Sequence, residues 1–362
     1  MNKSVSKTCG ILTSGGDAPG LNAAIRAVAR TAMNVYGMKV IGFEHGYRGL
    51  IENRSRVLKP TEFSSILTLG GTILGTSREK PFKDKNWCEE NNATCAVNSI
   101  KETYHKLGLD SLVILGGNGT NTTASLLVNE GLNIISLPKT IDNDIVETDI
   151  TFGFHTALSV ATEAIDRLHS TASSHNRVMV IEVMGHKAGW LALYSGVAGG
   201  GDVILVPEIP YDINSISRHL KQRGKDGKSF SIVVVAEGAR SIEEAGMDKK
   251  KFKKLRAQMS GSIGYRIAHE IQKAAELDAR VTVLGYVQRG GTPVAYDRIL
   301  ATEFGTAATN MVAQGDFGKM VAMQGNHIVG VPLEKVANRI KTVPLDHEMV
   351  KSARDVGTCL GD

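Results

Sequence analysis

The feature that most constrains the fold is a repeated alternation between short apolar runs and longer amphipathic stretches. The apolar runs are rich in β-branched residues: CGIL near Cys9, KVIGF near Val40, LVIL at 112–115, NIISL near Ile134, VMVIEV near Ile181, DVILV near Ile204, SIVVV near Val233 and VTVLG near Val283. Successive positions are apolar in these runs, which predicts strands buried on both faces, as in parallel sheets. Stretches at 22–33, 156–171 and 261–275 have helical spacing. Strands that alternate with such helices predict a doubly wound α/β fold.

Length and composition narrow the class of protein. The chain has 362 residues, of which 42% are hydrophobic, and this is enough for two compact domains. The 42 Lys and Arg residues are nearly balanced by 37 Asp and Glu, so nucleic acid is not an expected partner. No stretch approaches the roughly 18 uninterrupted apolar residues of a membrane span, so a membrane is not expected either. Cysteines 9, 88, 95 and 359 form no CxxC pair, which indicates free thiols in a reducing compartment. The first residues lack the apolar core of a signal peptide, so a cytoplasmic location is expected.

Glycine-rich turns follow two of the predicted strands. The first reads TSGGDAPG at 13–20 and the second GGNGT at 116–120, and each precedes a predicted helix. Glycine allows backbone N–H groups to approach an anion closely, and a helix N-terminus favours negative charge. A single turn of this kind could equally be a tight connection without a ligand. Neither turn fits GxxxxGK[ST] or GxGxxG, so any nucleotide would be held by another scheme.

An acidic segment follows the NIISL strand. It reads PKTIDND at 138–144 and carries two carboxylates, Asp142 and Asp144. Such a pair could hold Mg²⁺, or one carboxylate could accept a proton from an attacking hydroxyl. An Asx-type turn is the structural alternative.

Five motifs in order carry a resemblance to a known family: TSGGDAPGLNAAIR, GGNGT, PKTIDND, MGHKAGW and LGYVQRGG. Together they resemble the ATP- or pyrophosphate-dependent 6-phosphofructokinases, from Gly10 to about Arg298. NAD and diacylglycerol kinases share the second turn but are not expected to carry TIDND. The resemblance implies two doubly wound, mostly parallel α/β/α domains. It implies a donor domain at 1–153 plus 288–338 and a sugar-phosphate domain at 154–287 plus 339–362.

The resemblance also implies an activity. The enzyme would transfer a phosphoryl group from ATP to the 1-hydroxyl of fructose 6-phosphate in glycolysis, with Mg²⁺ as the cofactor. Its working form would be a homo-oligomer, usually a tetramer, in which Arg177 and Arg280 reach the acceptor site of a neighbouring subunit. Asp142 would be the catalytic base, Thr140 would contact the transferring phosphoryl group, and Arg78 would neutralise its charge.

The implied sites comprise these residues. The donor site would consist of Gly16, Arg78, Glu79, Gly117, Asn118, Gly119, Thr120 and Lys139. The acceptor site would consist of Thr140, Ile141, Asp142, Arg177, Met184, Gly185, His186, Glu237, Arg280, Tyr286, Val287, Gln288 and Arg289. The metal site would consist of Asn118 and Asp144.

Several positions leave alternatives open. Gly119 favours ATP, because pyrophosphate users carry an aspartate there that would exclude the rest of the nucleotide. Lys139 is the residue of pyrophosphate users, so pyrophosphate is the alternative donor. Asn118 replaces the aspartate that most members carry near magnesium, and a non-catalytic sugar-phosphate-binding homologue is a second alternative. His186 and Tyr286 stand where many bacterial members have arginine and histidine.

Overall fold

The computed structural model describes residues 7–82, 95–258 and 261–362. Cys88, one of the predicted free thiols, lies outside these ranges, and the described Cys9, Cys95 and Cys359 are free. The chain divides into two compact units. Unit 1 comprises 1–141, 145–156 and 289–340, and unit 2 comprises 142–144, 157–288 and 341–362.

Unit 1 is built on a sheet that has seven strands within the described residues, in the order β11-β10-β5-β4-β1-β2-β3. The five inner strands are parallel, and the outer β3 and β11 are antiparallel to their neighbours. The strands are β1 (Thr8–Thr13), β2 (Lys39–Phe43), β3 (Ser55–Val57), β4 (Ser111–Gly116), β5 (Ile134–Pro138), β10 (Lys319–Gln324) and β11 (His327–Pro332).

Helices cover both faces of this sheet, because alternate residues of each inner strand point to opposite sides. Ile11 packs in a core with α1 and α12, whereas the next residue, Leu12, packs in a second core with α2, α4, α5 and α13. The helices are α1 (Leu21–Tyr36), α2 (Tyr47–Ile51), η1 (Pro60–Phe63), η2 (Ile66–Thr68), α4 (Ala96–Lys106), α5 (Asn118–Asn129), α12 (Ala295–Gln314) and α13 (Leu333–Val336). Gly305 on α12 lets α1 approach closely, since a Cβ there would lie 2.7 Å from the Cβ of Ala27.

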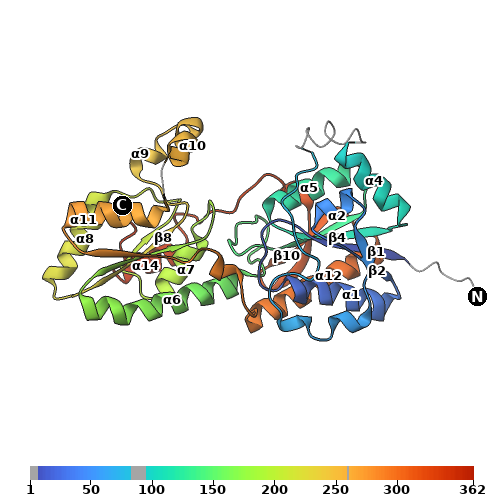
Figure 1. The fold of residues 1–362 in the computed structure, drawn as a ribbon, viewed down its shortest axis with the longest axis horizontal. Coiled ribbons are helices and arrows are strands. Elements are labelled where there is room, and N and C mark those ends of the chain that lie inside the picture. Colours follow the sequence, from blue (N-terminus) through green and yellow to red (C-terminus); the bar gives the residue numbers. More distant parts are fainter. Residues whose placement is uncertain (1–6, 83–94, 259–260) are drawn as a thin grey trace, which may run out of the picture. The chain divides into compact units, whose positions relative to one another are not determined.

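Unit 2 contains a sheet of four parallel strands among the described residues, in the order β7-β8-β6-β9. These are β6 (Val178–Val183), β7 (Val203–Leu205), β8 (Ser231–Ala236) and β9 (Ala279–Val283). Figure 1 shows α8 and α11 on one side of this sheet and α6 on the other. The helices are α6 (Phe154–His175), α7 (Trp190–Ala198), α8 (Ile213–Lys225), α9 (Ile242–Ala245), α10 (Lys249–Gln258), α11 (Ile263–Ala275), η3 (Gly285–Arg289) and α14 (Glu348–Asp355).

The predicted fold class is confirmed, since every apolar run used to predict a strand forms one. The sequence reasoning missed β3, β10 and β11 at the side of the unit 1 sheet. β10 and β11 form a hairpin whose turn, Gly325-Asn326, has positive φ at both residues and is a recognisable hairpin signal. β9 departs from the expected burial on both faces because it is an edge strand, and Val283 is exposed. Within the described ranges, each helix lacks the length or the apolar character needed to cross a membrane.

Candidate active site

The glycine turns and the Lys139 segment lie at the ends of three adjacent strands of unit 1. Thr13 of β1 is paired with Leu115 of β4, and Gly116 of β4 is paired with Pro138 of β5. The strands are parallel, so all three carboxyl ends meet at one edge of the sheet. The helix after β1 covers one face and the helix after β4 covers the other. The crevice between β1 and β4 is therefore a topological switch point, where α/β sheets bind ligands.

The turn after β1 is braced by the segment at 72–77. The N–H of Gly15 donates to the carbonyl of Ser77 at 2.8 Å, and the hydroxyl of Thr76 donates to the carbonyl of Gly15 at 2.7 Å. Gly15 has a φ of 87°, which favours glycine at this position. The turn therefore has a fixed conformation before any ligand arrives.

Two cationic side chains hold the next carbonyls of this turn. The ammonium group of Lys139 donates to the carbonyl of Gly16, and Nη1 of Arg289 donates to the carbonyl of Asp17 at 2.9 Å. A Cβ at Gly16 would lie 2.9 Å from that same Nη1, so a side chain there would displace Arg289. Lys139 and Arg289 place positive charge beside the turn, which suits an anionic ligand.

The second glycine turn leads directly into α5. Gly117 is its N-cap, no side chain caps the helix, and its first turn carries no acidic residue. The first N–H groups of a helix have no partner within the helix, and the helix dipole makes this end attractive to phosphate. Within the part of the chain that the structure describes, nothing lies within 4 Å of a Cβ built at Gly119 except its two chain neighbours and the backbone of its own helix. Space is therefore available beside this helix end.

Three other residues of the predicted donor site differ in their exposure and in their contacts. Thr120 is buried, and its carbonyl accepts a hydrogen bond from the buried Tyr47 hydroxyl at 3.0 Å. Arg78 is exposed and directly follows Ser77, whose carbonyl holds the first turn. Glu79 forms an ion pair with Arg48 at 3.0 Å.

The acidic segment runs from unit 1 into unit 2. Thr140 and Ile141 belong to unit 1, and both are buried. The carbonyl of Thr140 accepts a hydrogen bond from the Thr151 hydroxyl at 2.8 Å, which fixes the backbone there. Asp142 and Asp144 are grouped with unit 2, and each is 8% exposed.

Most of the remaining acceptor residues lie at the carboxyl ends of β6, β8 and β9 in unit 2. The N–H of His186 donates to a carboxylate oxygen of Glu237 at 2.7 Å. The N–H of Met184 donates to the side-chain oxygen of Gln288 at 3.4 Å, and Gln288 is fully buried. Gly185 also belongs to this loop, and its φ of 144° favours glycine. The structure thus brings these predicted residues of three strand ends together.

Tyr286 and Val287 follow β9 in the same region of unit 2. Both side chains are strongly exposed, Tyr286 by 74%. They are available to a ligand or to another chain. Arg289, the last residue of η3, belongs to unit 1. Its guanidinium contacts the turn after β1 at 13–20, which we call the donor turn.

Arg177 and Arg280 lie at the opposite ends of the unit 2 strands. Arg177 immediately precedes β6, and Arg280 pairs with Met179 near the amino end of β6. Both form ion pairs with Asp278, Arg177 at 2.6 Å. The hydrogen bond from Arg177 lowers the pKa of Asp278. A strand of this length separates these arginines from Met184 by roughly 20 Å, so they do not share a pocket with it within one chain.

The predicted metal ligands offer few protein donors. Among the described residues, no group of three His, Cys, Asp or Glu side chains is arranged to hold a metal ion. Asn118 and Asp144 would supply one amide and one carboxylate oxygen. Magnesium commonly binds one or two carboxylates and completes its shell with water and substrate phosphates. This donor set therefore fits Mg²⁺ that arrives with a phosphorylated ligand.

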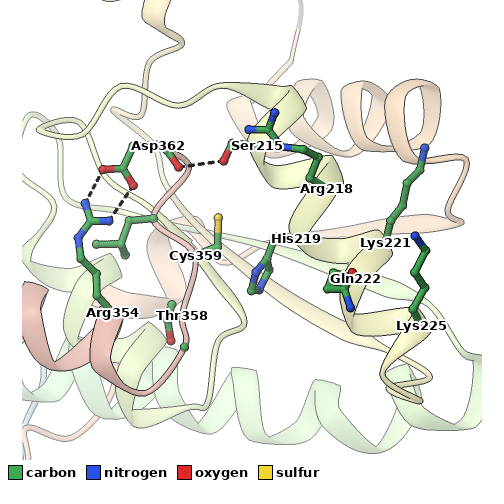
Figure 2. A pocket seen from close by; sticks show the side chains of 12 residues that line it. Ser215, Arg218, His219, Lys221, Gln222, Lys225, Arg354, Thr358, Cys359 and Asp362 are labelled. Atoms are coloured by element: carbon green, nitrogen blue, oxygen red, sulfur yellow. Dashed lines mark hydrogen bonds and ion pairs between the residues drawn. The ribbon is translucent and has the colours of Figure 1, made fainter.

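A separate cavity of about 750 Å³ lies in unit 2 between α8 and the segment at 354–362. Figure 2 shows the side chains that line it, including Arg218, His219 and Lys225 of α8 and the ion pair between Arg354 and Asp362. None of the predicted site residues lines this cavity.

The sequence reasoning missed two contributors to the donor turn. Thr76 braces the carbonyl of Gly15, and Asp17 supplies the carbonyl that Arg289 contacts. From the segment GTSRE at 75–79, the predicted donor site included Arg78 and Glu79 but not Thr76. The adjacent Thr76-Ser77 pair was a usable signal, because small hydroxyl residues commonly bind turn backbone.

Comparisons with known proteins agree with this architecture. Residues 8–312 match the family model described as Phosphofructokinase. The chain is 62% identical to the ATP-dependent 6-phosphofructokinase of Spirochaeta thermophila, over 100% of both chains. It is 50% identical to that of Propionibacterium freudenreichii subsp. shermanii, over 99% of this chain and 100% of the other.

A solved structure of phosphofructokinase from Saccharomyces cerevisiae superposes with a TM-score of 0.76 at 31% identity. The match covers 98% of this chain and 46% of the yeast chain, so this chain spans about half of that larger protein. The motifs, the arrangement of strands and these full-length matches lead to one conclusion: the chain belongs to the phosphofructokinase family.

Proposed function

We propose that this protein is an ATP-dependent 6-phosphofructokinase of glycolysis. It transfers the terminal phosphoryl group of ATP to the 1-hydroxyl of fructose 6-phosphate, and the products are fructose 1,6-bisphosphate and ADP. The observation that carries the proposal is the meeting of three phosphate-type segments at the carboxyl ends of β1, β4 and β5. The names of the bacterial relatives support ATP as the donor. The reaction also favours a cytoplasmic location, where these metabolites occur.

Unit 1 would bind the donor. The turn after β1 and the N-terminus of α5 offer backbone N–H groups to the phosphates, and Lys139 offers a compensating charge. The space beside Gly119 supports a nucleotide, because no side chain blocks the region that the α-phosphate would need. Arg78 would neutralise charge on the transferring group, and Thr140 would contact it.

Unit 2 would bind the acceptor. Met184, Gly185, His186 and Glu237 would contact the sugar, and Gln288 holds the Met184 backbone in place. Asp142 would accept the proton of the 1-hydroxyl as it attacks phosphorus. Phosphoryl transfer proceeds mainly through positioning and charge stabilisation, so a carboxylate with a late role in proton transfer is adequate.

A divalent cation is expected in any kinase that uses ATP, because it neutralises the phosphate oxygens. We assign this role to Mg²⁺. Asn118 and Asp144 would hold it together with donor phosphates and water. Because Asn118 provides no charge, the protein's own contribution to metal affinity would be small.

The acceptor site would be shared between subunits. Arg177 and Arg280 are needed to hold the 6-phosphate in the proposed site, yet they lie at the far end of β6 from Met184. A second chain can supply them where one chain cannot. We therefore propose a homo-oligomer, most simply a tetramer, with active sites completed across a subunit interface.

Coupled assays with each donor test the proposal. Purified protein is given fructose 6-phosphate, Mg²⁺ and either ATP or pyrophosphate, and fructose 1,6-bisphosphate is measured. We expect product with ATP and little with pyrophosphate. Product with pyrophosphate but not with ATP would show that pyrophosphate is the phosphoryl donor, the alternative that Lys139 favours. No product with either donor, together with binding of fructose 6-phosphate, would identify a non-catalytic homologue.

A further inference from the structure

Three consecutive carbonyls in the donor turn are each held by a side chain from a different part of unit 1. Thr76 donates to Gly15 at 2.7 Å, Lys139 donates to Gly16, and Arg289 donates to Asp17 at 2.9 Å. Thr76 lies in the segment after η2, Lys139 follows β5, and Arg289 ends η3. Residues distant in sequence therefore converge on one short stretch of backbone.

The carbonyl and the N–H of one peptide unit cannot be oriented independently. In a planar trans peptide, the carbonyl of one residue and the N–H of the next point in opposite directions. The described chain contains no cis peptide. Holding the carbonyls of Gly15, Gly16 and Asp17 therefore turns the N–H groups of residues 16–18 away from the three side-chain donors.

Two of these N–H groups, those of Gly16 and Asp17, belong to partly exposed residues and are available to a ligand. Among the described residues, none of the N–H groups of Gly16, Asp17 and Ala18 donates a hydrogen bond to another protein group. Successive N–H groups in a turn form a concave site that binds anions. Phosphate oxygens of the donor would be suitable acceptors for the Gly16 and Asp17 N–H groups.

We propose that Thr76 and Arg289, together with Lys139, position the donor turn so that its N–H groups are already aimed at phosphate. Arg289 then acts on the donor through the Asp17 carbonyl, in addition to the acceptor role that its motif implies. The guanidinium also keeps a positive charge beside the turn, and its contact requires glycine at position 16. The inference rests on the proposed function, because it concerns the same donor site.

Binding of the donor product in the absence of sugar phosphate separates this role from an acceptor role. Calorimetry with ADP and Mg²⁺ is carried out on wild-type protein and on Arg289→Ala, Arg289→Lys and Thr76→Val. We expect Arg289→Ala to weaken ADP binding roughly tenfold, because the turn loses a hydrogen bond from a charged group. Arg289→Lys should restore part of the loss, and Thr76→Val should cost about threefold.

Hydrogen exchange supplies a second readout that needs no ligand. The backbone amides in residues 13–20 should exchange faster in Arg289→Ala than in wild type, because the turn loses one of its restraints. Arg218→Ala is the matched control, since Arg218 is exposed on α8 and remote in sequence from the donor turn. It should change neither ADP binding nor exchange in this segment.

The outcomes separate failure of the inference from failure of the proposed function. If Arg289→Ala raises only the KM for fructose 6-phosphate, with ADP binding and exchange unchanged, the positioning role is wrong and the kinase assignment stands. If wild-type protein forms no product and does not bind ADP, the proposed function fails and the inference fails with it.

Discussion

At the residue scale, we propose that Gly119 controls which phosphoryl donor can enter. Apart from its two chain neighbours and the backbone of its own helix, no atom of the described residues lies within 4 Å of a Cβ built at this position, so Gly119→Asp should fold normally. The new carboxylate would repel the donor phosphates. We expect ATP-dependent turnover to fall about a hundredfold or more, because like-charge contacts cost several kcal/mol and ~1.4 kcal/mol is a factor of ten. Coupled assays with Gly119→Ala as the control test this, and full ATP activity in the aspartate variant would contradict it.

A second prediction at this scale concerns Asp142, the proposed catalytic base. Asp142→Asn keeps the shape of the side chain but removes its basicity. Turnover should fall roughly a hundredfold to ten-thousandfold, the range for loss of a general base, while KM values change little. Steady-state kinetics provide the measurement, and Asp355→Asn at an exposed position provides the control. Retention of turnover would show that another group accepts the proton.

At the element scale, the connection between β4 and α5 depends on Gly116. A Cβ there would lie against Thr120, 2.5 Å from its Oγ1. Gly116→Ala should therefore lower the free energy of unfolding by about 1–3 kcal/mol, as expected for overpacking. Urea unfolding measures this. Gly119→Ala, in the same connection but facing open space, should be neutral or stabilising because alanine favours helix.

The ion pair between α9 and α11 makes unit 2 sensitive to acid. Arg266 donates to Glu244 at 2.9 Å through Nη2, and Glu244 is buried. Burial alone would raise the pKa of Glu244, but hydrogen bonds from Arg266 and from the Ser241 N–H, together with the charges of Arg266 and Arg256, outweigh burial and lower it from its ordinary value of 4.5. The folded state then binds protons less readily than the unfolded state. This contribution to stability is complete above pH 4.5 and is lost as the pH falls through the lowered pKa.

Glu244→Gln tests that dependence. At neutral pH it should destabilise the protein by about 1–3 kcal/mol, because the partly buried Arg266 loses a charged hydrogen-bond partner. The difference from wild type should shrink as the pH is lowered below about 4.5, where the wild-type carboxylate also becomes neutral. Urea unfolding across this pH range provides the measurement, with the exposed neighbour in Glu243→Gln as the control. A difference that stays constant with pH would assign the loss to packing.

At the scale of the whole molecule, shared sites predict complementation between inactive variants. Glu237→Gln damages the sugar pocket of its own chain, whereas Arg280→Ala damages the pocket of the neighbour. Mixed oligomers refolded from the two variants should regain part of the wild-type turnover, because some sites receive neither defect. Each variant refolded alone should remain impaired. Analytical ultracentrifugation should give a mass above the 38.8 kDa of one chain. Absence of any recovery in confirmed hybrids would place both residues in a site within one chain.

The local signals needed for the fold class were present in the sequence. Apolar runs such as VMVIEV and SIVVV could be recognised as buried strands because both alternating positions are apolar. Glycines marked the strand-to-helix turns: Gly15 has positive φ, and a Cβ at Gly16 or Gly116 would lie too close to a neighbouring side chain. These features depend on residues that are close together along the chain, so they can be recognised in the sequence.

Only the tertiary structure decided which distant residues meet. Strand order placed the turn after β1 beside the turn after β4, and it put Arg177 and Arg280 at the opposite end of β6 from Met184. Arg289 carries a motif of the acceptor site, yet its guanidinium holds the Asp17 carbonyl 272 positions away in sequence. Such contacts are set by the packing of whole elements against one another, and no spacing along the chain encodes them.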